Sequence, residues 1–80
     1  MLAELSAAEK AVGLKQSRKA IREERAKRVF LAGDADPLII EPVQAECELM
    51  GVPVVREYTM GQLGRACQIH VGASVVAELV

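Results

Sequence analysis

Aromatic residues are almost absent from this sequence, which has no Trp and only Phe30 and Tyr58 among its 80 residues. Proteins that hold single-stranded nucleic acid commonly stack its bases on aromatic side chains. The absence therefore argues against base stacking as the main mode of binding. The hydrophobic fraction of 51% comes from aliphatic residues and suffices for the core of one small domain over residues 1–80.

Long apolar runs are also missing. No uninterrupted apolar segment approaches the roughly 20 residues that are needed to span a bilayer. The N-terminal segment is interrupted by Glu4 and Glu9, and it lacks the basic start of a secretory signal. We therefore expect a soluble, cytoplasmic protein with no membrane partner.

Cysteine is scarce, and Cys47 and Cys67 do not form a Cys-x-x-Cys pair. Two isolated cysteines fit a reducing compartment. Cys67 and His70 lie three residues apart, but a structural zinc site usually has two such closely spaced ligand pairs. We expect buried or half-buried thiols and no metal or other cofactor, with a metal site or a redox role as the alternatives.

Charge is distributed very unevenly along the chain. Residues 10–28 contain eight of the ten Lys and Arg residues and only two of the eleven acidic ones, which gives this segment a net charge of +6. Residues 1–9 carry −2 and residues 29–80 carry −5. The overall charge of −1 thus conceals one segment that attracts a polyanion.

Residue patterns predict a chain in which helices and short strands alternate. Helical spacing, capping signals and turn residues predict four helices, over residues 2–13, 15–26, 42–51 and 59–69. Short apolar runs predict three strands, over residues 28–33, 52–58 and 73–80. Such alternation indicates an α/β domain with helices on both faces of a small sheet.

Three of the predicted helix ends depend on specific residues. Pro42 suits the first position of a helix, where its missing N–H costs nothing. Gly51 suits the C-terminal cap, because glycine tolerates the left-handed conformation found there. Thr59 and Gln62 have the spacing of a capping box, in which each side chain binds the other residue's backbone N–H.

Five basic residues fall on one stripe of the second predicted helix. They are Lys15, Arg18, Lys19, Arg22 and Arg25. The stripe starts at a helix N-terminus, where free N–H groups and the helix dipole favour an anion. Glu23 and Glu24 lie off the stripe, so pairing along the helix does not neutralise it. Contact with phosphate is the better interpretation, and a solvated helix face is the alternative.

Other polar motifs do not indicate an enzyme. Asp34 and Asp36 form an Asp-x-Asp after an apolar strand, as in some phosphotransferases, but the residues that normally follow are missing. Turn formation and helix capping explain these two carboxylates better. His70 has no neighbouring serine nucleophile or carboxylate at helical spacing, and is expected in a loop. Gly61 and Gly64 are not followed by the Gly-Lys-Ser/Thr of a phosphate-binding loop.

Four short motifs follow one another in order over residues of about 11–80. The first, Gly13-Leu14-Lys15-Gln16-Ser17-Arg18-Lys19-Ala20, is similar to a Gly-x-Asn/Lys-Glu/Gln-x-x-Lys-Ala signature. The others are residues 34–37, 51–54 and 63–73. Together they resemble the kink-turn-binding ribosomal proteins of the large-subunit seven-Ae and thirty-e type, most closely the short bacterial homologues. The resemblance implies a three-layer α/β/α sandwich with a mixed sheet of about four strands.

The resemblance also implies roles for residues of the first motif. Gly13 allows the backbone to approach RNA closely, and Lys15 and Gln16 take the positions that read tandem sheared G·A pairs. Archaeal members usually have Asn and Glu at these two positions, whereas the short bacterial homologues have this Lys-Gln pair. Lys19 reaches bases or phosphate.

The same comparison assigns the remaining RNA contacts. Arg18 and Arg22 lie beside the three polar residues just named and would contact phosphate. Ile69, Val71 and Gly72 match the loop that covers the bulged nucleotides.

The sequence thus predicts a non-enzymatic, monomeric protein that binds structured RNA containing a kink-turn, with the ribosome as a further expected partner and no DNA partner. The alternative is a protein-interaction or assembly module of the same fold that has lost RNA binding. The RNA hypothesis requires Lys15, Gln16 and Lys19 to be exposed on one patch. The interaction hypothesis predicts a large exposed apolar patch elsewhere.

Overall fold

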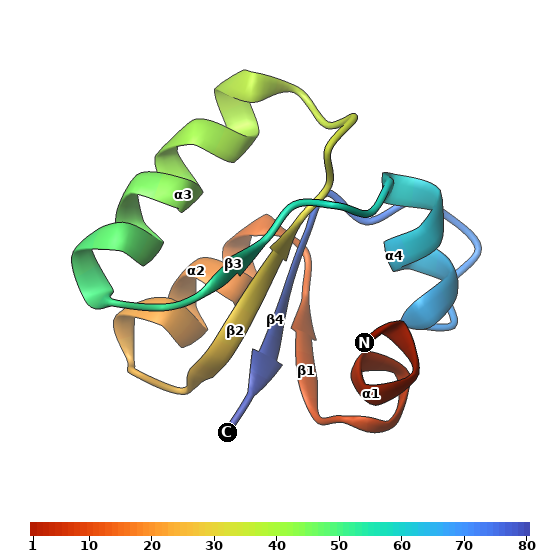
Figure 1. Ribbon diagram of the computed structural model, residues 1–80, viewed down its shortest axis with the longest axis horizontal. Coiled ribbons are helices and arrows are strands. Elements are labelled where there is room, and N and C mark those ends of the chain that lie inside the picture. Colours follow the sequence, from red (N-terminus) through yellow and green to blue (C-terminus); the bar gives the residue numbers. More distant parts are fainter.

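A four-stranded mixed sheet forms the centre of the computed structural model, which describes residues 1–80 (Figure 1). The elements in chain order are α1 (Leu2–Ala7), β1 (Lys10–Val12), α2 (Leu14–Arg22), β2 (Ala26–Leu31), α3 (Pro37–Met50), β3 (Val54–Val55), α4 (Met60–Ala66) and β4 (Val75–Leu79). None of the helices has the length and apolar character needed to cross a membrane. The predicted α/β class with helices on both faces of a small sheet is confirmed.

The strands are arranged in the order β1-β4-β2-β3. The C-terminal strand β4 lies inside the sheet and pairs antiparallel with both β1 and β2, and β3 pairs parallel with β2 at the edge. Ala77 of β4 is therefore opposite Ala11 on one side and Val29 on the other. The last strand of the sequence joins the two halves of the sheet.

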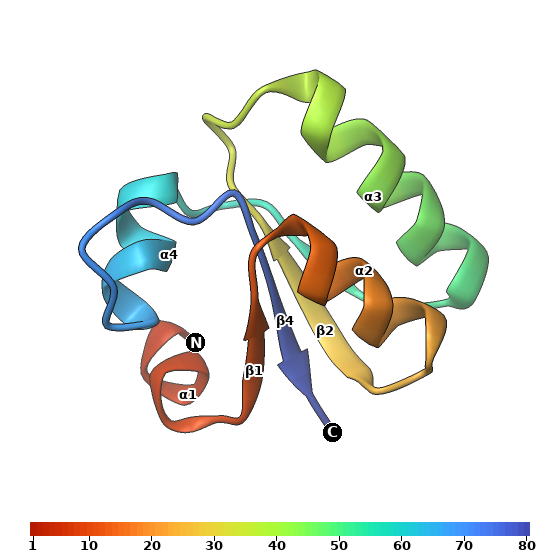
Figure 2. The same ribbon diagram turned by 180° about the vertical axis from the view of Figure 1, so that it is seen from behind.

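Two apolar cores lie on opposite faces of the sheet, because successive side chains of a strand point to opposite sides. Val29 and Leu31 of β2 pack under α2 and α3, whereas Phe30 packs with Leu5 of α1 and Leu63 of α4 on the other face. Figure 2 shows the pair α2 and α3 on one side of the strands, with α1 and α4 apart from them. These helix pairs and the sheet form the three layers of an α/β/α sandwich.

The prediction of a single helix over residues 2–13 is wrong. The helix α1 ends at Ala7, and Lys10–Val12 form the edge strand β1 beside β4. Helical spacing is present at Leu2, Leu5, Ala8 and Val12. The segment Lys10–Val12 nevertheless forms backbone hydrogen bonds to β4, which no local sequence pattern reveals.

The helix α3 starts earlier than predicted. It begins at Pro37, and the Asp36 side chain caps it by accepting a hydrogen bond from the Leu38 N–H at 2.9 Å. Pro42 therefore lies inside the helix and not at its first position. At the other end Gly51 has φ 70° and caps the helix in the left-handed conformation, as predicted.

The strand predicted over residues 52–58 is reduced to Val54–Val55. Pro53 has no N–H to donate, and β3 is an edge strand that pairs only with β2. The predicted capping box at α4 is present: Gln62 N–H donates to the Thr59 hydroxyl, and Thr59 N–H donates to the Gln62 side chain.

Residues 67–74, the α4–β4 loop, fold back along α4, which ends at Ala66 and not near Ile69. The Ile69 N–H donates to the Gly64 carbonyl, and the Ala73 N–H donates to the Met60 carbonyl. The loop passes so close to α4 that a Cβ atom at Gly64 would collide with the Val71 carbonyl. Glycine at position 64 thus determines where the loop lies.

This close approach predicts that Gly64→Ala destabilises the protein by about 1–3 kcal/mol, because the loop backbone must move. Gly61→Ala is the matched control in the same helix, since its Cβ would meet only the Thr59 hydroxyl at 3.8 Å. It should be neutral or stabilise by about 0.5–1 kcal/mol, the usual advantage of Ala over Gly in a helix. Chemical denaturation measures both values, and equal effects would contradict the assigned contact.

Candidate functional site

The first turn of α2 and the α4–β4 loop meet at one end of the sheet (Figure 2). The Gly13 N–H donates to the Val75 carbonyl at 2.9 Å. Gly13 precedes α2, and Val75 directly follows the loop, so this bond connects the two segments. Residues that are more than 50 positions apart in sequence are thereby brought to one edge.

Gly13 occupies the N-cap of α2 with φ 98° and ψ 163°. This conformation is strained for any residue with a Cβ atom. A Cβ atom there would have nothing within 4 Å, so the backbone angle and not crowding requires glycine. No side chain caps α2, so the N–H groups of its first turn point outward and can bind an anion.

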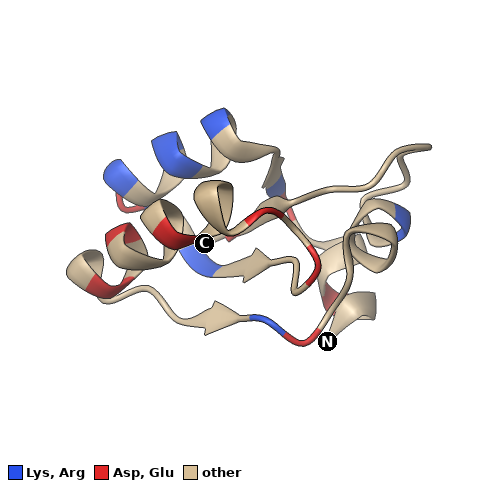
Figure 3. Ribbon diagram, turned by 90° about the horizontal axis from the view of Figure 1, so that it is seen from above, with Lys and Arg blue, Asp and Glu red and all other residues tan.

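The orientation of α2 is fixed by its buried side. Ala20 and Ile21 pack into the core, and the buried Ser17 hydroxyl donates to the Ala11 carbonyl of β1 at 3.1 Å. Lys15, Gln16 and Lys19 consequently face solvent; positions three and four apart on a helix are neighbours, so these side chains form one patch. Figure 3 shows basic residues on successive turns of α2.

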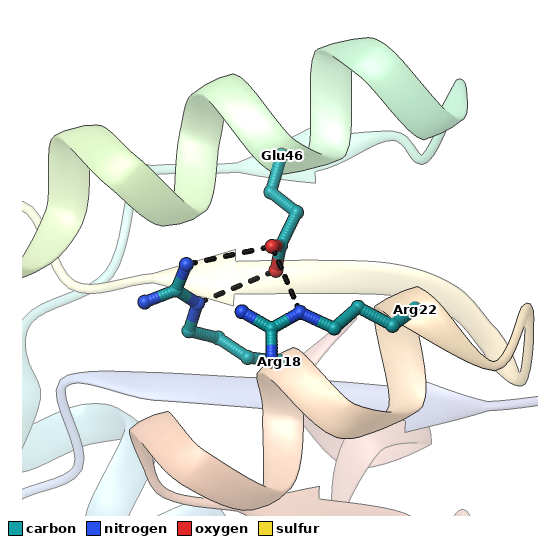
Figure 4. A network of polar contacts seen from close by, with 3 residues as sticks. All are labelled: Arg18, Arg22 and Glu46. Atoms are coloured by element: carbon teal, nitrogen blue, oxygen red, sulfur yellow. Dashed lines mark hydrogen bonds and ion pairs between the residues drawn. The ribbon is translucent and has the colours of Figure 1, made fainter.

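Two of the predicted RNA-contacting arginines are held by a carboxylate on α3 (Figure 4). Glu46 accepts hydrogen bonds from Arg18 Nε and Nη2, both at 3.4 Å, and from Arg22 Nε at 3.1 Å. Partial burial raises the pKa of Glu46, but the hydrogen bonds and charges of the two arginines outweigh this and hold the pKa below its usual value. The carboxylate is therefore ionised at neutral pH.

The sequence had suggested that the basic side chains of the stripe are unpaired. Most of them are in fact paired with carboxylates. The helix predicted over residues 15–26 ends at Arg22, so Arg25 lies in the turn after α2, where its Nε binds Glu23 at 2.8 Å. Lys15 and Lys19 are the two members of the stripe with no ion-pair partner. Glu46 lies 28 residues after Arg18 and 24 after Arg22, and these pairs depend on how α2 and α3 pack. Spacing within the helix could therefore not reveal them.

The α4–β4 loop presents two apolar side chains to solvent. Ile69 is 37% exposed and Val71 is 71% exposed. Gly72 lies against Met60, whose Cβ would be 3.0 Å from a Cβ at position 72. The exposed His70 lies in this loop, as predicted. All nine predicted site residues therefore belong to α2, its cap or this loop.

Leu14 is 37% exposed at the first position of α2. It adds an apolar side chain to the edge that holds Gly13 and Lys15. Its position directly after a glycine N-cap, before the amphipathic pattern begins, is the signal that sequence reasoning missed. Glu46 and Ser17 are the other contributors that the sequence did not indicate.

The two carboxylates after β2 support the ends of helices. Asp36 caps α3, and the Asp34 side chain accepts a hydrogen bond from the Met60 N–H at 2.8 Å. Their predicted role in capping and turn formation is confirmed.

The thiols are buried and half-buried, as predicted. Burial, assisted by Glu46 and Glu48, raises the pKa of Cys47 to about 11. Burial also raises the pKa of Cys67, against a smaller lowering effect of Lys10. Such thiols are poor nucleophiles, because the reactive species is the thiolate. Nowhere do three or more His, Cys, Asp or Glu side chains gather in a way that could hold a metal ion.

This chain is similar to known proteins in sequence and in fold. Residues 3–80 match the model of the ribosomal protein L7Ae/L30e/S12e/Gadd45 family. RNA-binding protein GWCH70_0105 of Geobacillus sp. (strain WCH70) is 44% identical over 73 residues, which cover 91% of this chain and 89% of that protein. RNA-binding protein YbxF of Geobacillus stearothermophilus is 44% identical over 75 residues, or 94% of this chain and 92% of that one.

A solved structure agrees with these relatives. The Giardia lamblia 15.5kD RNA binding protein superimposes with a TM-score of 0.87 at 29% identity, over 99% of this chain and 68% of that chain. The resemblance that the four sequence motifs indicated is confirmed. The chain therefore belongs to the ribosomal protein L7Ae/L30e/S12e/Gadd45 family.

Proposed function

We propose that this protein is a non-catalytic RNA-binding protein that recognises kink-turn RNA. The observation that carries the proposal is the backbone bond from Gly13 to Val75, which sets the first turn of α2 beside the α4–β4 loop. Its family and the relatives named RNA-binding proteins support the same function. We further propose that it acts as a monomer in the cytoplasm, on ribosomal or other structured RNA.

The arrangement suits recognition of a bent RNA by shape. The uncapped first turn of α2 offers N–H groups and two unpaired lysines, Lys15 and Lys19, to phosphates and base edges. Ile69 and Val71 offer apolar contact to bases that a bend leaves unstacked. In this proposal a bent RNA contacts both segments at once and a straight duplex does not, so the protein would bind the bent state and increase its population.

Arg18 and Arg22 have a supporting role in this proposal. One Glu46 carboxylate faces two guanidinium groups, so the cluster retains one positive charge and fixes the direction of both side chains. Pre-positioned charges lose less side-chain entropy when phosphate binds.

A binding titration against a kink-turn RNA and a matched straight duplex tests the proposed function. We expect clear preference for the kink-turn at physiological salt. Lys19→Ala and Gln16→Ala should each cost roughly 1–3 kcal/mol on the kink-turn and reduce this preference, because a contact to a base edge is specific. Equal affinity of the wild-type protein for the two RNAs would refute shape recognition.

Arg25→Ala is the matched control for these variants. Arg25 is a nearby basic residue in the turn after α2 and is paired with Glu23 at 2.8 Å. It should weaken binding to all RNAs to a similar, small extent. Loss of discrimination in Arg25→Ala, with discrimination retained in Lys19→Ala, would show that the roles are assigned wrongly.

Glu46→Gln should lower the free energy of unfolding by up to about 1 kcal/mol at pH 7, because two ion pairs are weakened. The pKa of Glu46 is lowered by folding, so its ionised form stabilises the protein above the unfolded pKa. The difference between wild type and variant should therefore disappear as the pH falls below 4.5, the usual pKa. Urea denaturation across this range measures it.

The same variant should bind the straight duplex more tightly. Freeing one positive charge adds about one phosphate contact, which is worth roughly two- to eight-fold at about 0.1 M salt. Glu41→Gln makes the same change of charge on α3, where the carboxylate has no ion-pair partner, and should have neither effect. Identical behaviour of the two variants would mean that only net charge matters.

Val71→Ala should change the ranking of kink-turn RNAs with different bulge nucleotides more than it changes their average affinity. Apolar contact tolerates many bases but depends on the size of the bulge. A panel of bulge variants titrated against both proteins measures this, with Val80→Ala as the control at another exposed valine. A uniform loss would identify a general clamp, and no change would show that the loop does not touch RNA.

A further inference from the structure

The helix α3 has a second apolar side that faces solvent. Leu38 is 82% exposed and Leu49 is 84% exposed, and Pro42 and Ala45 between them are also exposed. Isolated exposed leucines are common on proteins, but a continuous apolar stripe is not. This stripe is distinct from the candidate RNA site, since it contains no residue of α2 or of the α4–β4 loop.

The four residues align along the helix. Steps of four, three and four residues keep Leu38, Pro42, Ala45 and Leu49 on one side, opposite the buried Ile40, Val43 and Cys47. At 1.5 Å per residue the stripe is roughly 16 Å long. We call these four residues the outer stripe of α3. It has the length and spacing with which one helix packs against another.

Pro42 lies in the middle of the stripe. Proline has no N–H, so Pro42 cannot donate the usual helical hydrogen bond to the Leu38 carbonyl. A proline in mid-helix is normally costly, and this one is exposed and packs against no core residue. Its ring adds an apolar surface between Leu38 and Leu49.

The charges around the outer stripe are acidic. α3 contains Glu41, Glu46 and Glu48 and neither Lys nor Arg. Glu41 and Glu48 are exposed along one border of the stripe and, with Gln44, Ala45 and Arg56, line a shallow hollow. Arg56 donates to Gln44 at 2.8 Å at the edge of that hollow. A cationic side chain on a partner would find the two carboxylates of Glu41 and Glu48 beside the apolar contact.

We propose that the outer stripe of α3 binds a basic segment of another protein that carries aliphatic side chains along one face. RNA is unsuited to this surface, because its phosphates would meet the glutamates. A second copy of the chain is also unsuited, since pairing α3 with α3 would oppose Glu41 and Glu48 with the same residues of the other copy, and Arg56, already bound to Gln44, is the one basic residue of the hollow. A protein-docking function requires an exposed apolar patch away from the RNA site. This protein has both such a patch and the candidate RNA site.

The experiment uses the full isotope-labelled chain and a synthetic helical peptide with Leu at helical spacing and Lys elsewhere. Backbone NMR shifts caused by the peptide should fall on the outer stripe and on Glu41 and Glu48. Leu38→Gln and Leu49→Gln should each weaken the peptide at least about five-fold, as expected for loss of a buried leucine contact. Val80→Gln, at a valine that is 83% exposed elsewhere, should leave the affinity unchanged.

A charge-reversed peptide makes the result decisive. The same peptide with Glu in place of Lys should bind at least ten-fold more weakly. Equal binding of both peptides, shifts centred on α2, or no binding of the Lys peptide at millimolar concentration would overturn the proposal. So would a dimer that dissociates in Leu38→Gln, because the stripe would then bind a second copy. The leucines are exposed, so these variants should fold, which thermal unfolding checks.

Discussion

The candidate site depends on one backbone hydrogen bond, from the Gly13 N–H to the Val75 carbonyl. It extends the pairing of β1 with β4 by one step beyond Val12, so the chain enters α2 at the point where β4 leaves its loop. Gly13 can make this bond because its φ of 98° turns the chain from the strand into the helix. The sheet thus positions both halves of the site, and neither half is a local feature of the sequence.

The positive charge of residues 10–28 is concentrated by folding. Lys10 donates to the carbonyls of Ser6 and Ala8, and Lys27 and Arg28 bind the buried Glu78. Arg18 and Arg22 of α2 bind Glu46, and Arg25 in the following turn binds Glu23. Of the eight basic side chains of this segment, the two without such partners are Lys15 and Lys19. The net charge of +6 therefore overstates how strongly residues 10–28 attract a polyanion, and it does not show where on the surface the unpaired charge lies. The structure places that charge at the first turns of α2.

Features that depend on neighbouring residues could be predicted, and features that depend on packing could not. The capping box at Thr59 and the glycine cap at Gly51 involve groups a few residues apart, so spacing identifies them. The strand β1 exists because β4 pairs with it, and the capture of Arg18 by Glu46 exists because α2 packs against α3. Sequence reasoning named the candidate site residues through motif and resemblance, but it could not show which of their charges are already paired.

The two helices on one face of the sheet have opposite charge, share an apolar core and are joined by the ion pairs of a single carboxylate. α2 has no acidic residue and α3 has no basic one, and Glu46 crosses between them to Arg18 and Arg22. A polyanion approaching this face is attracted to the start of α2 and repelled from α3, so the field itself orients it. With the proposed RNA site on α2, the same separation directs RNA away from the outer stripe of α3. One small sheet thus carries a basic and an acidic helix side by side, and Glu46 of the acidic helix fixes two arginines of the basic one.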